Sequence, residues 1–309
     1  MRFRSDPASI RGSIVPVVTP FLSDGSVDLE SIPRLVEWHL EQGAHGISVL
    51  GSTGEPSTQT VAERIAVMEA AAAAVSDRVP FVPGTGTTKL AETLELTAAA
   101  ERLGADAVLV VSPYYSRPTQ QGLYEWYAAV AREFPALPII LYNVPIRTAV
   151  DVAPATAARL ARDFDNVVGI KETTKDFEHA SLVLHACGSD FLVYSGIELL
   201  CYPMLVLGGA GHFSCVANYA PRPVAELYDA FVEGRHDDAR RLHFDLHPLV
   251  ELAFLETNPA PAKFAMAELG LIPSAHVRPP LAAVTAETRA RVVELLRSSP
   301  HVALEPAAA

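Results

Sequence analysis

The chain has 309 residues, of which half are apolar and 19% are charged, and its formal net charge is -12 at pH 7. This composition is typical of a globular protein with a large buried core. The negative charge argues against nucleic acid as a partner, because non-specific binding to nucleic acid needs a positive field. Residues 1–11 contain three arginines and no signal-peptide-like apolar run, and no later run is long enough to span a membrane. We therefore expect a cytoplasmic protein with no membrane partner.

Short β-branched apolar runs alternate along the chain with longer Ala- and Leu-rich stretches of helical period. This pattern is typical of repeated βα units around a parallel sheet, and eight such runs predict a (β/α)8 barrel, an α/β fold that forms one domain of roughly 250 residues or more. The predicted strands are 13–19, 46–50, 80–84, 107–111, 138–143, 167–171, 191–195 and 210–214. The predicted helices between them include 31–42, 61–75, 89–102 and 123–134.

After the eighth strand the sequence is helical at 220–234, 237–254 and 261–269, which is more than one closing helix requires. We therefore expect a barrel over residues 1–219 and a C-terminal helical extension over 220–300. The Ala- and Pro-rich tail, 301–309, is expected to be frayed. The cysteines are too few and too widely spaced for a disulfide framework, and we expect reduced, mostly packed thiols at Cys187, Cys201 and Cys215.

Function in a barrel gathers at the carboxyl ends of the strands, and four of these ends carry unusual groups. The second strand leads into the loop 51–55, the fourth into 112–115, the fifth into 142–145, and the sixth ends at Lys171. Burial at this place disfavours the charged ammonium, so we expect the pKa of Lys171 to be lowered. A lower pKa increases the neutral fraction of the amine, which is the form that reacts as a nucleophile. Considered alone, a lysine at a strand end more often simply reaches water.

Several other kinds of site have little support. The loop 51–55 offers clustered backbone N–H groups suited to a carboxylate or phosphate, although ordinary βα turns are also rich in glycines and hydroxyls. No dinucleotide fingerprint, P-loop, GxSxG elbow, HExxH motif or cysteine cluster is present. His243 and His247 lie one helical turn apart but lack an evident third metal ligand. We therefore expect no metal and no organic cofactor, while a keto-acid-binding sensor and a flavin- or nicotinamide-dependent barrel oxidoreductase remain alternatives.

The chain contains four motifs whose order, and whose spacing along the predicted barrel, resemble those of the dihydrodipicolinate synthase / N-acetylneuraminate lyase family. The motifs are Gly51-Ser52-Thr53-Gly54-Glu55, Pro113-Tyr114-Tyr115, Tyr142-Asn143-Val144-Pro145 and Gly169-Ile170-Lys171-Glu172. The likeness spans roughly residues 12–297. It implies a (β/α)8 barrel with a C-terminal helical domain, pyruvate as substrate, no cofactor, and a homotetramer that is a dimer of dimers.

The resemblance also implies a role for each matching residue. Lys171 corresponds to the lysine that forms a Schiff base with pyruvate, and Tyr142 to the tyrosine that shuttles protons. Ser52 corresponds to the hydroxyl of the proton relay, and Tyr115 to the relay tyrosine that the neighbouring subunit inserts. The backbone N–H groups of Ser52 and Thr53 correspond to those that hold the pyruvate carboxylate.

The second substrate is less well specified. Arg147 matches the arginine that synthase members use for the acceptor's carboxylate, which favours aspartate semialdehyde. The acceptor side also includes Gly196, Ile197 and Phe213, and the last two make it more apolar than a synthase pocket. Another pyruvate aldolase, or a dehydratase of 2-keto-3-deoxy sugar acids, therefore remains an alternative.

The resemblance does not predict inhibition by lysine. Only two of the residues that bind lysine in lysine-inhibited synthases are kept, Glu92 and Tyr114. The other positions are occupied by Pro56, Val61, Arg64 and Thr88.

Overall fold

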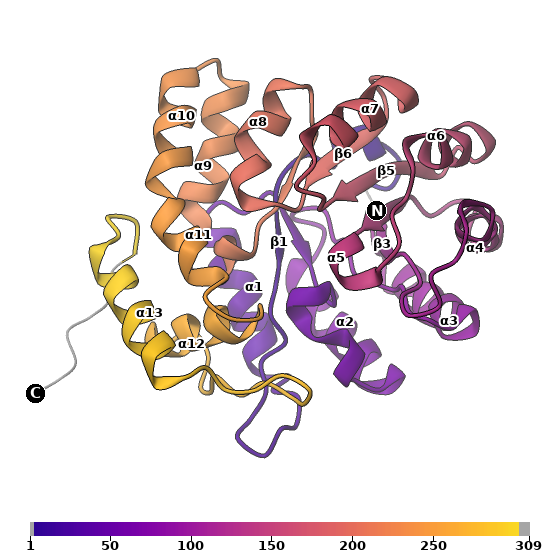
Figure 1. Ribbon diagram of the computed structural model, residues 1–309. Coiled ribbons are helices and arrows are strands. Elements are labelled where there is room, and N and C mark those ends of the chain that lie inside the picture. The colour runs from indigo at the N-terminus through magenta and orange to yellow at the C-terminus, as the bar shows by residue number, and fades with distance from the viewer. Residues whose placement is uncertain (1–2, 303–309) are drawn as a thin grey trace, which may run out of the picture.

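The structure, a computed structural model, describes residues 3–302. Seven strands form one curled sheet in which every neighbouring pair is parallel, in the order β2-β1-β7-β6-β5-β4-β3, with helices packed around it (Figure 1). The parallel α/β architecture that the alternating pattern predicts is thus confirmed. The strands are β1 (Gly12–Pro16), β2 (Gly46–Ser48), β3 (Val108–Val111), β4 (Ile139–Asn143), β5 (Val167–Glu172), β6 (Leu192–Ser195) and β7 (Gly211–Phe213).

The helices follow the strands along the chain and continue beyond the last one. They are α1 (Ser31–Glu41), α2 (Val61–Val75), α3 (Leu90–Arg102), α4 (Gln120–Glu133), α5 (Pro145–Thr148), α6 (Pro154–Asp163), α7 (Phe177–Cys187), α8 (Cys201–Val206), α9 (Pro221–Val232), α10 (His236–Asp245), α11 (His247–Ala253), α12 (Ala260–Glu268) and α13 (Ala286–Ser298). The prediction of one helix over 237–254 is wrong, because α10 ends before Leu246 and α11 begins after it. Pro248 explains the break, since it has no N–H to continue the helical ladder.

The prediction of a third strand at 80–84 is also corrected. This segment is not assigned as a strand, but it makes single parallel bridges to β2 and to β3, the two edges of the sheet. On one side the N–H of Gly84 donates to the carbonyl of Val49 at 2.8 Å, and on the other the N–H of Leu109 donates to the carbonyl of Pro83 at 2.9 Å. Pro83 has no N–H to donate in return, which interrupts the ladder.

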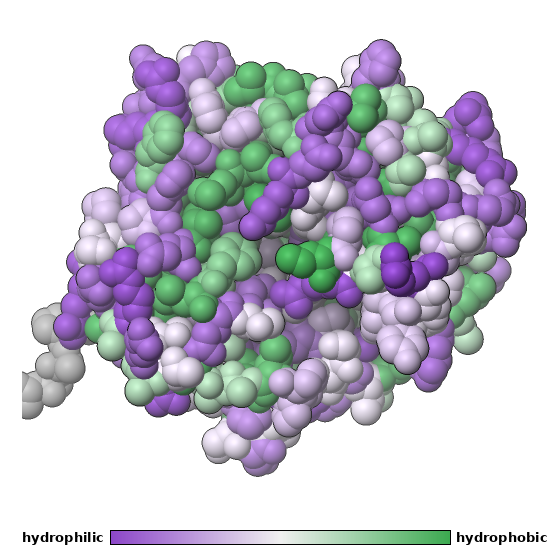
Figure 2. Space-filling model, in the orientation of Figure 1, coloured by the Kyte–Doolittle hydropathy of each residue, from purple (hydrophilic) through white to green (hydrophobic). Residues whose placement is uncertain are grey.

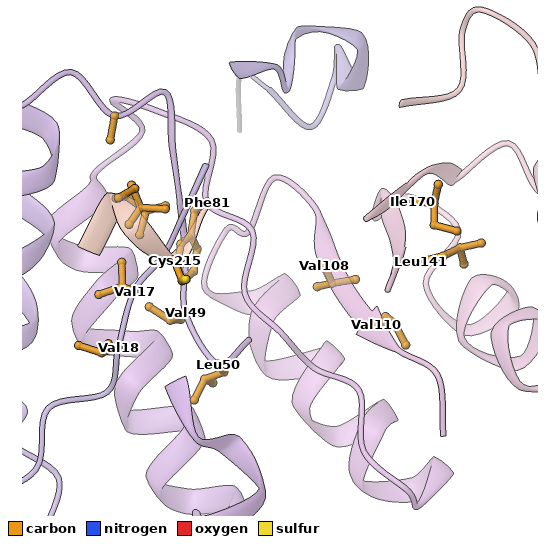
Figure 3. Packing of buried hydrophobic residues seen from close by; sticks show 14 of the residues in the cluster. Val17, Val18, Val49, Leu50, Phe81, Val108, Val110, Leu141, Ile170 and Cys215 are labelled. Atoms are coloured by element: carbon orange, nitrogen blue, oxygen red, sulfur yellow. The ribbon is translucent and has the colours of Figure 1, made fainter. Parts of the chain in front are cut away.

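Alternate residues of each strand pack on opposite faces of the sheet, as the two-residue period of a strand requires. On β4, Ile140 and Tyr142 belong to a small cluster on the inner face that also contains Phe213. Leu141 instead belongs to the large cluster between the sheet and the helices, where it lies beside Ile170 of β5 (Figure 3). The side chains of Leu141 and Asn143, which flank Tyr142 in the strand, therefore point away from the inner face.

Beyond β7, α9 contacts α10, and α11, α12 and α13 contact one another (Figure 1). The three cysteines are free thiols, two of them buried, in agreement with the prediction. Within residues 3–302 no helix combines the length and apolar character needed to cross a membrane. Of the predicted frayed tail, residues 303–309 lie outside the described part of the chain.

Candidate active site

A cavity of about 220 Å³ lies at the carboxyl ends of the strands, as expected for this class of fold. A hollow is visible near the middle of the face in Figure 2. The cavity wall includes residues of β3 and β4, residues of the loops after β2, β3 and β4, and one residue of α2. Among them are Ser52, Arg64, Tyr114, Tyr142 and Arg147.

Ser52 and Tyr142 meet in this cavity. The Ser52 hydroxyl lies 3.1 Å from the Tyr142 hydroxyl, within hydrogen-bonding distance. Tyr142 is only 5% exposed because its ring is part of the inner cluster. The structure thus joins two residues that the sequence separates by 90 positions, in the arrangement that a proton relay requires.

Lys171 lies directly beside Tyr142, because the register of β4 and β5 pairs the two residues. Its Nζ is 4.3 Å from the centroid of the Tyr142 ring and 5.1 Å from that of the Phe213 ring. The side chain is buried, and within residues 3–302 its amine forms no ion pair or hydrogen bond. The amine therefore lies beside two aromatic rings and makes no direct contact with a carboxylate of the described chain.

The predicted substrate residue Gly196 lies against the stem of this lysine. A Cβ atom at position 196 would come within 2.7 Å of Lys171 Cε, so the glycine makes room for the lysine side chain. Nearby, the carboxyl of Glu198 accepts hydrogen bonds from the Ser214 hydroxyl and the Cys215 N–H. Burial raises the pKa of Glu198, and the charge of Lys171 partly opposes this rise. Glu198 is not among the residues predicted from the sequence, although a glutamate in an otherwise apolar run is a usable signal.

On the outer face, a polar network lies behind the same two strands. Asn143, next to Tyr142, donates from Nδ2 to Glu172, next to Lys171, at 3.0 Å, and also to Asp151 at 2.6 Å. Nε2 of His179 on α7 lies 3.2 Å from the Glu172 carboxylate, and this carboxylate raises the pKa of His179. This network links the two strands to each other, and none of its residues is predicted from the sequence to have this role.

The loop after β2 is held by a distant part of the chain. The buried Thr53 hydroxyl accepts a hydrogen bond of 3.1 Å from Asn258 Nδ2. The Asn258 carbonyl in turn accepts from Nη2 of Arg147 at 3.2 Å. Asn258 thus contacts two of the predicted substrate-binding residues, Thr53 and Arg147, and the sequence contains no local signal for this role.

Glu55, at the end of the same loop, is fully buried and forms an ion pair with Lys263 of α12 at 2.5 Å. Its other carboxylate oxygen accepts from the backbone N–H of Arg278 at 3.0 Å. Lys263 Nζ also donates to the carbonyl of His276. Burial lowers the pKa of Lys263 to about 8, even though Glu55 acts in the opposite direction. The C-terminal segment therefore holds the loop through charges that water does not reach.

Of the predicted site residues, Ser52, Tyr142 and Arg147 line the cavity, whereas the others do not: Thr53, Tyr115, Lys171, Gly196, Ile197 and Phe213. Tyr115 is 94% exposed and adopts a left-handed backbone conformation with φ of 71°. The backbone of Ile197 bonds to the Ser195 side chain, and Ile197 does not line the cavity. Within the described residues, no three His, Cys, Asp or Glu side chains are grouped to hold a metal ion. The rings of His243 and His247 pack edge to face, with centroids 5.2 Å apart.

Fold and site together define an α/β protein whose candidate active site contains a buried lysine and a tyrosine at the carboxyl ends of adjacent parallel strands. The sequence model of the Dihydrodipicolinate synthetase family matches residues 9–299. The chain belongs to this family, as the motif resemblance predicts.

Relatives and solved structures agree with this assignment. The chain is 45% identical to the 4-hydroxy-tetrahydrodipicolinate synthase of Thermus thermophilus over 91% of this chain and 94% of the relative. It is also 45% identical to the synthase of the same name from Pelobacter propionicus, over 93% of this chain and 98% of the relative. The structure of a dihydrodipicolinate synthase from Acinetobacter baumannii, complexed with pyruvate, superposes with a TM-score of 0.91 at 40% identity, covering 95% of this chain and all of that one.

The buried pair of Glu55 and Lys263 leads to a prediction about stability. Glu55→Gln or Lys263→Met alone leaves one buried charge unpaired and should cost about 3–5 kcal/mol of unfolding free energy. The double variant leaves no unpaired charge, so it should lose clearly less than the sum of the two single losses. Denaturant unfolding of all four proteins measures this coupling.

An exposed ion pair supplies the control for this comparison of single and double variants. Arg240 and Asp237 on α10 form an ion pair at a similar distance, 2.8 Å, but in water. Arg240→Gln should cost less than about 1 kcal/mol. Strictly additive losses in the Glu55 and Lys263 cycle would show that the buried pair does not act as a unit.

Proposed function

We propose that this protein catalyses the 4-hydroxy-tetrahydrodipicolinate synthase reaction, in which pyruvate, bound as an imine on Lys171, condenses with aspartate semialdehyde. The observation that carries the proposal is the amine of Lys171, which is buried beside the rings of Tyr142 and Phe213 and forms no ion pair with a described residue. An amine in such a place can react as a nucleophile instead of serving in an ion pair. The relatives of the same name at 45% identity support the choice of reaction.

In the proposed mechanism, the neutral amine of Lys171 attacks the keto carbon of pyruvate, and the carbonyl oxygen leaves as water. The protonated imine withdraws electrons from the adjacent methyl group, so that loss of a methyl proton gives an enamine. The enamine carbon then forms a bond to the aldehyde carbon of the acceptor, whose oxygen takes up a proton. The amino group of the acceptor then adds to the imine carbon, and the bond from this carbon to Lys171 Nζ breaks, which releases the cyclic product and the free amine. The hydroxyls of Tyr142 and Ser52, 3.1 Å apart, are placed to move these protons.

The two carboxylates of the substrates have different proposed partners. Ser52–Gly54 forms a short 3-10 turn, and the first N–H groups of such a turn have no acceptor within it. We assign the N–H groups of Ser52 and Thr53 to the pyruvate carboxylate. Arg147, which lines the cavity and is steadied by the Asn258 carbonyl, is assigned to the acceptor's carboxylate.

One observation favours the alternative substrates. The Phe213 ring lies close to Lys171, which gives this side of the site an apolar surface that suits a less polar acceptor. Another pyruvate aldolase reaction, or dehydration of a 2-keto-3-deoxy sugar acid, is therefore the second candidate. Two assays distinguish these activities. One measures the consumption of pyruvate with a series of aldehydes, and the other measures product formation from 2-keto acids.

The proposed scaffold is a closed eight-stranded barrel over residues 1–219, with the segment 80–85 in the place of the remaining strand. Its hydrogen bonds to β2 and β3 support this closure. Residues 220–300 then form the closing and C-terminal helices, of which α12 reaches the site through Lys263.

We further propose a homotetramer, a dimer of dimers, in which Tyr115 completes the relay of a neighbouring subunit. In a single chain the Tyr115 ring lies almost wholly in water, and Ile146 of α5 is 86% exposed. Exposed apolar side chains mark an interface where they form one contiguous patch, and we propose that these two belong to such a patch. Insertion of Tyr115 into a neighbour's cavity accounts for its absence from its own.

Trapping with borohydride tests the imine on Lys171. Borohydride added with pyruvate should reduce the imine and leave a stable adduct, which peptide mass spectrometry should locate on Lys171. Lys171→Met should remain unmodified. An adduct on another lysine, or none at all in active protein, would contradict the assignment.

Subunit mixing tests the role of Tyr115. Lys171→Met and Tyr115→Phe subunits should each be nearly inactive alone, and exchange between them should restore some activity, because mixed interfaces contain one intact site. Exchange is verified separately by native mass spectrometry. Absence of any recovery after proven exchange would exclude the intersubunit role.

A further inference from the structure

Four polar side chains behind β4 and β5 contact one another in a closed circuit, on the face of the sheet opposite to Lys171. The Asn143 amide of β4 donates to Glu172 of β5 at 3.0 Å, and to Asp151 between α5 and α6 at 2.6 Å. His179 of α7 closes the circuit, because its Nε2 lies 3.2 Å from Glu172 and its Nδ1 lies 3.5 Å from Asp151. This polar quartet therefore connects four separate segments of the chain.

Both ring nitrogens of His179 face a carboxylate. A neutral imidazole has a single N–H, so one of its nitrogens would turn a lone pair toward a carboxylate that has no proton to donate. The Glu172 carboxylate also accepts from the backbone N–H of Thr174 at 2.8 Å, in addition to the Asn143 amide, as an ionised carboxylate does. Only the protonated imidazole can donate to both carboxylates. The geometry thus favours a positively charged His179.

The charges around His179 favour the same state. Three carboxylates, from β5, from the segment before α6 and from the N-cap of α7, raise its pKa above the ordinary value of 6.5, although burial acts in the opposite direction. They are Glu172, which has the largest effect, Asp151 and Asp176. Helix α6 packs beside α7 (Figure 1), and its Arg159 and Arg162 form ion pairs with Asp163 of the same helix. Strand β6, which also contacts α7, carries no charged residue.

The quartet acts on Lys171 through the backbone. Glu172 directly follows Lys171 on β5, and Asn143 directly follows Tyr142 on β4. Contacts that hold the outward pair together therefore also set the separation of the inward pair. The amine of Lys171 forms no ion pair or hydrogen bond with a described residue, so its place depends on the strand that carries it.

We propose that protonated His179 is a positioning residue, which bridges Glu172 and Asp151 and thereby holds the end of β5 that carries Lys171. Loss of the proton leaves two carboxylates facing a neutral imidazole, and the bridge weakens. Reaction of pyruvate with Lys171 should then slow as the pH rises through the pKa of His179. This inference rests on the proposed function, since the amine that is positioned is the one that forms the imine.

Two measurements on the full chain, made across the pH range in which histidine titrates, test the inference. NMR of protein labelled at histidine gives the pKa of His179, whose signal is identified by its absence from His179→Gln. Exchange of the pyruvate methyl protons for deuterium, without an acceptor, gives the rate of the first chemical steps. The exchange rate should fall with rising pH, with its midpoint at the measured pKa. A lysine nucleophile alone gives the opposite trend, because its neutral fraction grows with pH.

Variants connect this fall in rate to His179. His179→Gln should lose the pH-dependent fall and should exchange about tenfold more slowly than the wild type on the acid side of the midpoint. Asp151→Asn removes one carboxylate and should lower the pKa of His179, so the exchange profile and the NMR titration should move to lower pH by the same amount. His185→Gln is the matched control, since His185 is exposed in the last turn of the same helix, and it should change neither.

Thermal unfolding measures the same bridge without reference to activity. Because the pKa of His179 is raised in the folded protein, its stabilising effect is fully present below pH 6.5 and is lost as the pH rises through the folded pKa. The melting temperature of the wild type should exceed that of His179→Gln at acid pH, and the difference should shrink as the pH rises.

Two results would overturn the positioning role. One is a wild-type exchange rate and pH profile in His179→Gln, and the other is an Asp151→Asn exchange profile that does not follow the NMR titration of His179. Failure of the proposed function gives a different result, because wild-type protein would then exchange no methyl protons at any pH. That result would remove the positioning role as well, while the titration of His179 and the difference in melting temperature would persist.

Discussion

The pairing of β4 with β5 is the constraint on which the candidate site depends. It sets Tyr142 opposite Lys171 and Asn143 opposite Glu172. Because successive side chains alternate between faces, the first pair points inward and the second outward. The outward pair is joined by a hydrogen bond, so the strands are fixed by groups that take no part in the chemistry. The amine of Lys171 is thereby positioned without a polar bond to any described residue, and it stays available for reaction.

A second constraint acts from the far end of the sequence. The C-terminal segment reaches the loop after β2 through Asn258, Lys263 and the backbone of Arg278. These contacts position Thr53 directly and fix the loop that carries Ser52. The helices beyond the sheet are thus part of the site's architecture, even though none of their side chains is assigned a chemical step.

The sequence predicts those features that leave a local pattern. Apolar runs such as 167–170 predict buried parallel strands, and the strand-end rule with the family motifs leads to Lys171, Tyr142 and Ser52. Prolines account for the two errors, since 80–84 has β-type composition but cannot complete a ladder, and Pro248 divides an otherwise periodic helix. The roles of Asn258 and of the Glu172 network could not be predicted, because contacts between distant segments leave no trace in spacing or periodicity.

The central claim is that Lys171 and Tyr142 together make the methyl group of pyruvate acidic. Proton NMR in deuterium oxide measures this most directly, with pyruvate and enzyme but no acceptor. The wild-type protein should exchange the methyl protons of pyruvate for deuterium, Tyr142→Phe should do so about 10²-fold more slowly or worse, and Lys171→Met should not accelerate exchange above the rate in buffer. Exchange at the wild-type rate in Lys171→Met would contradict the account.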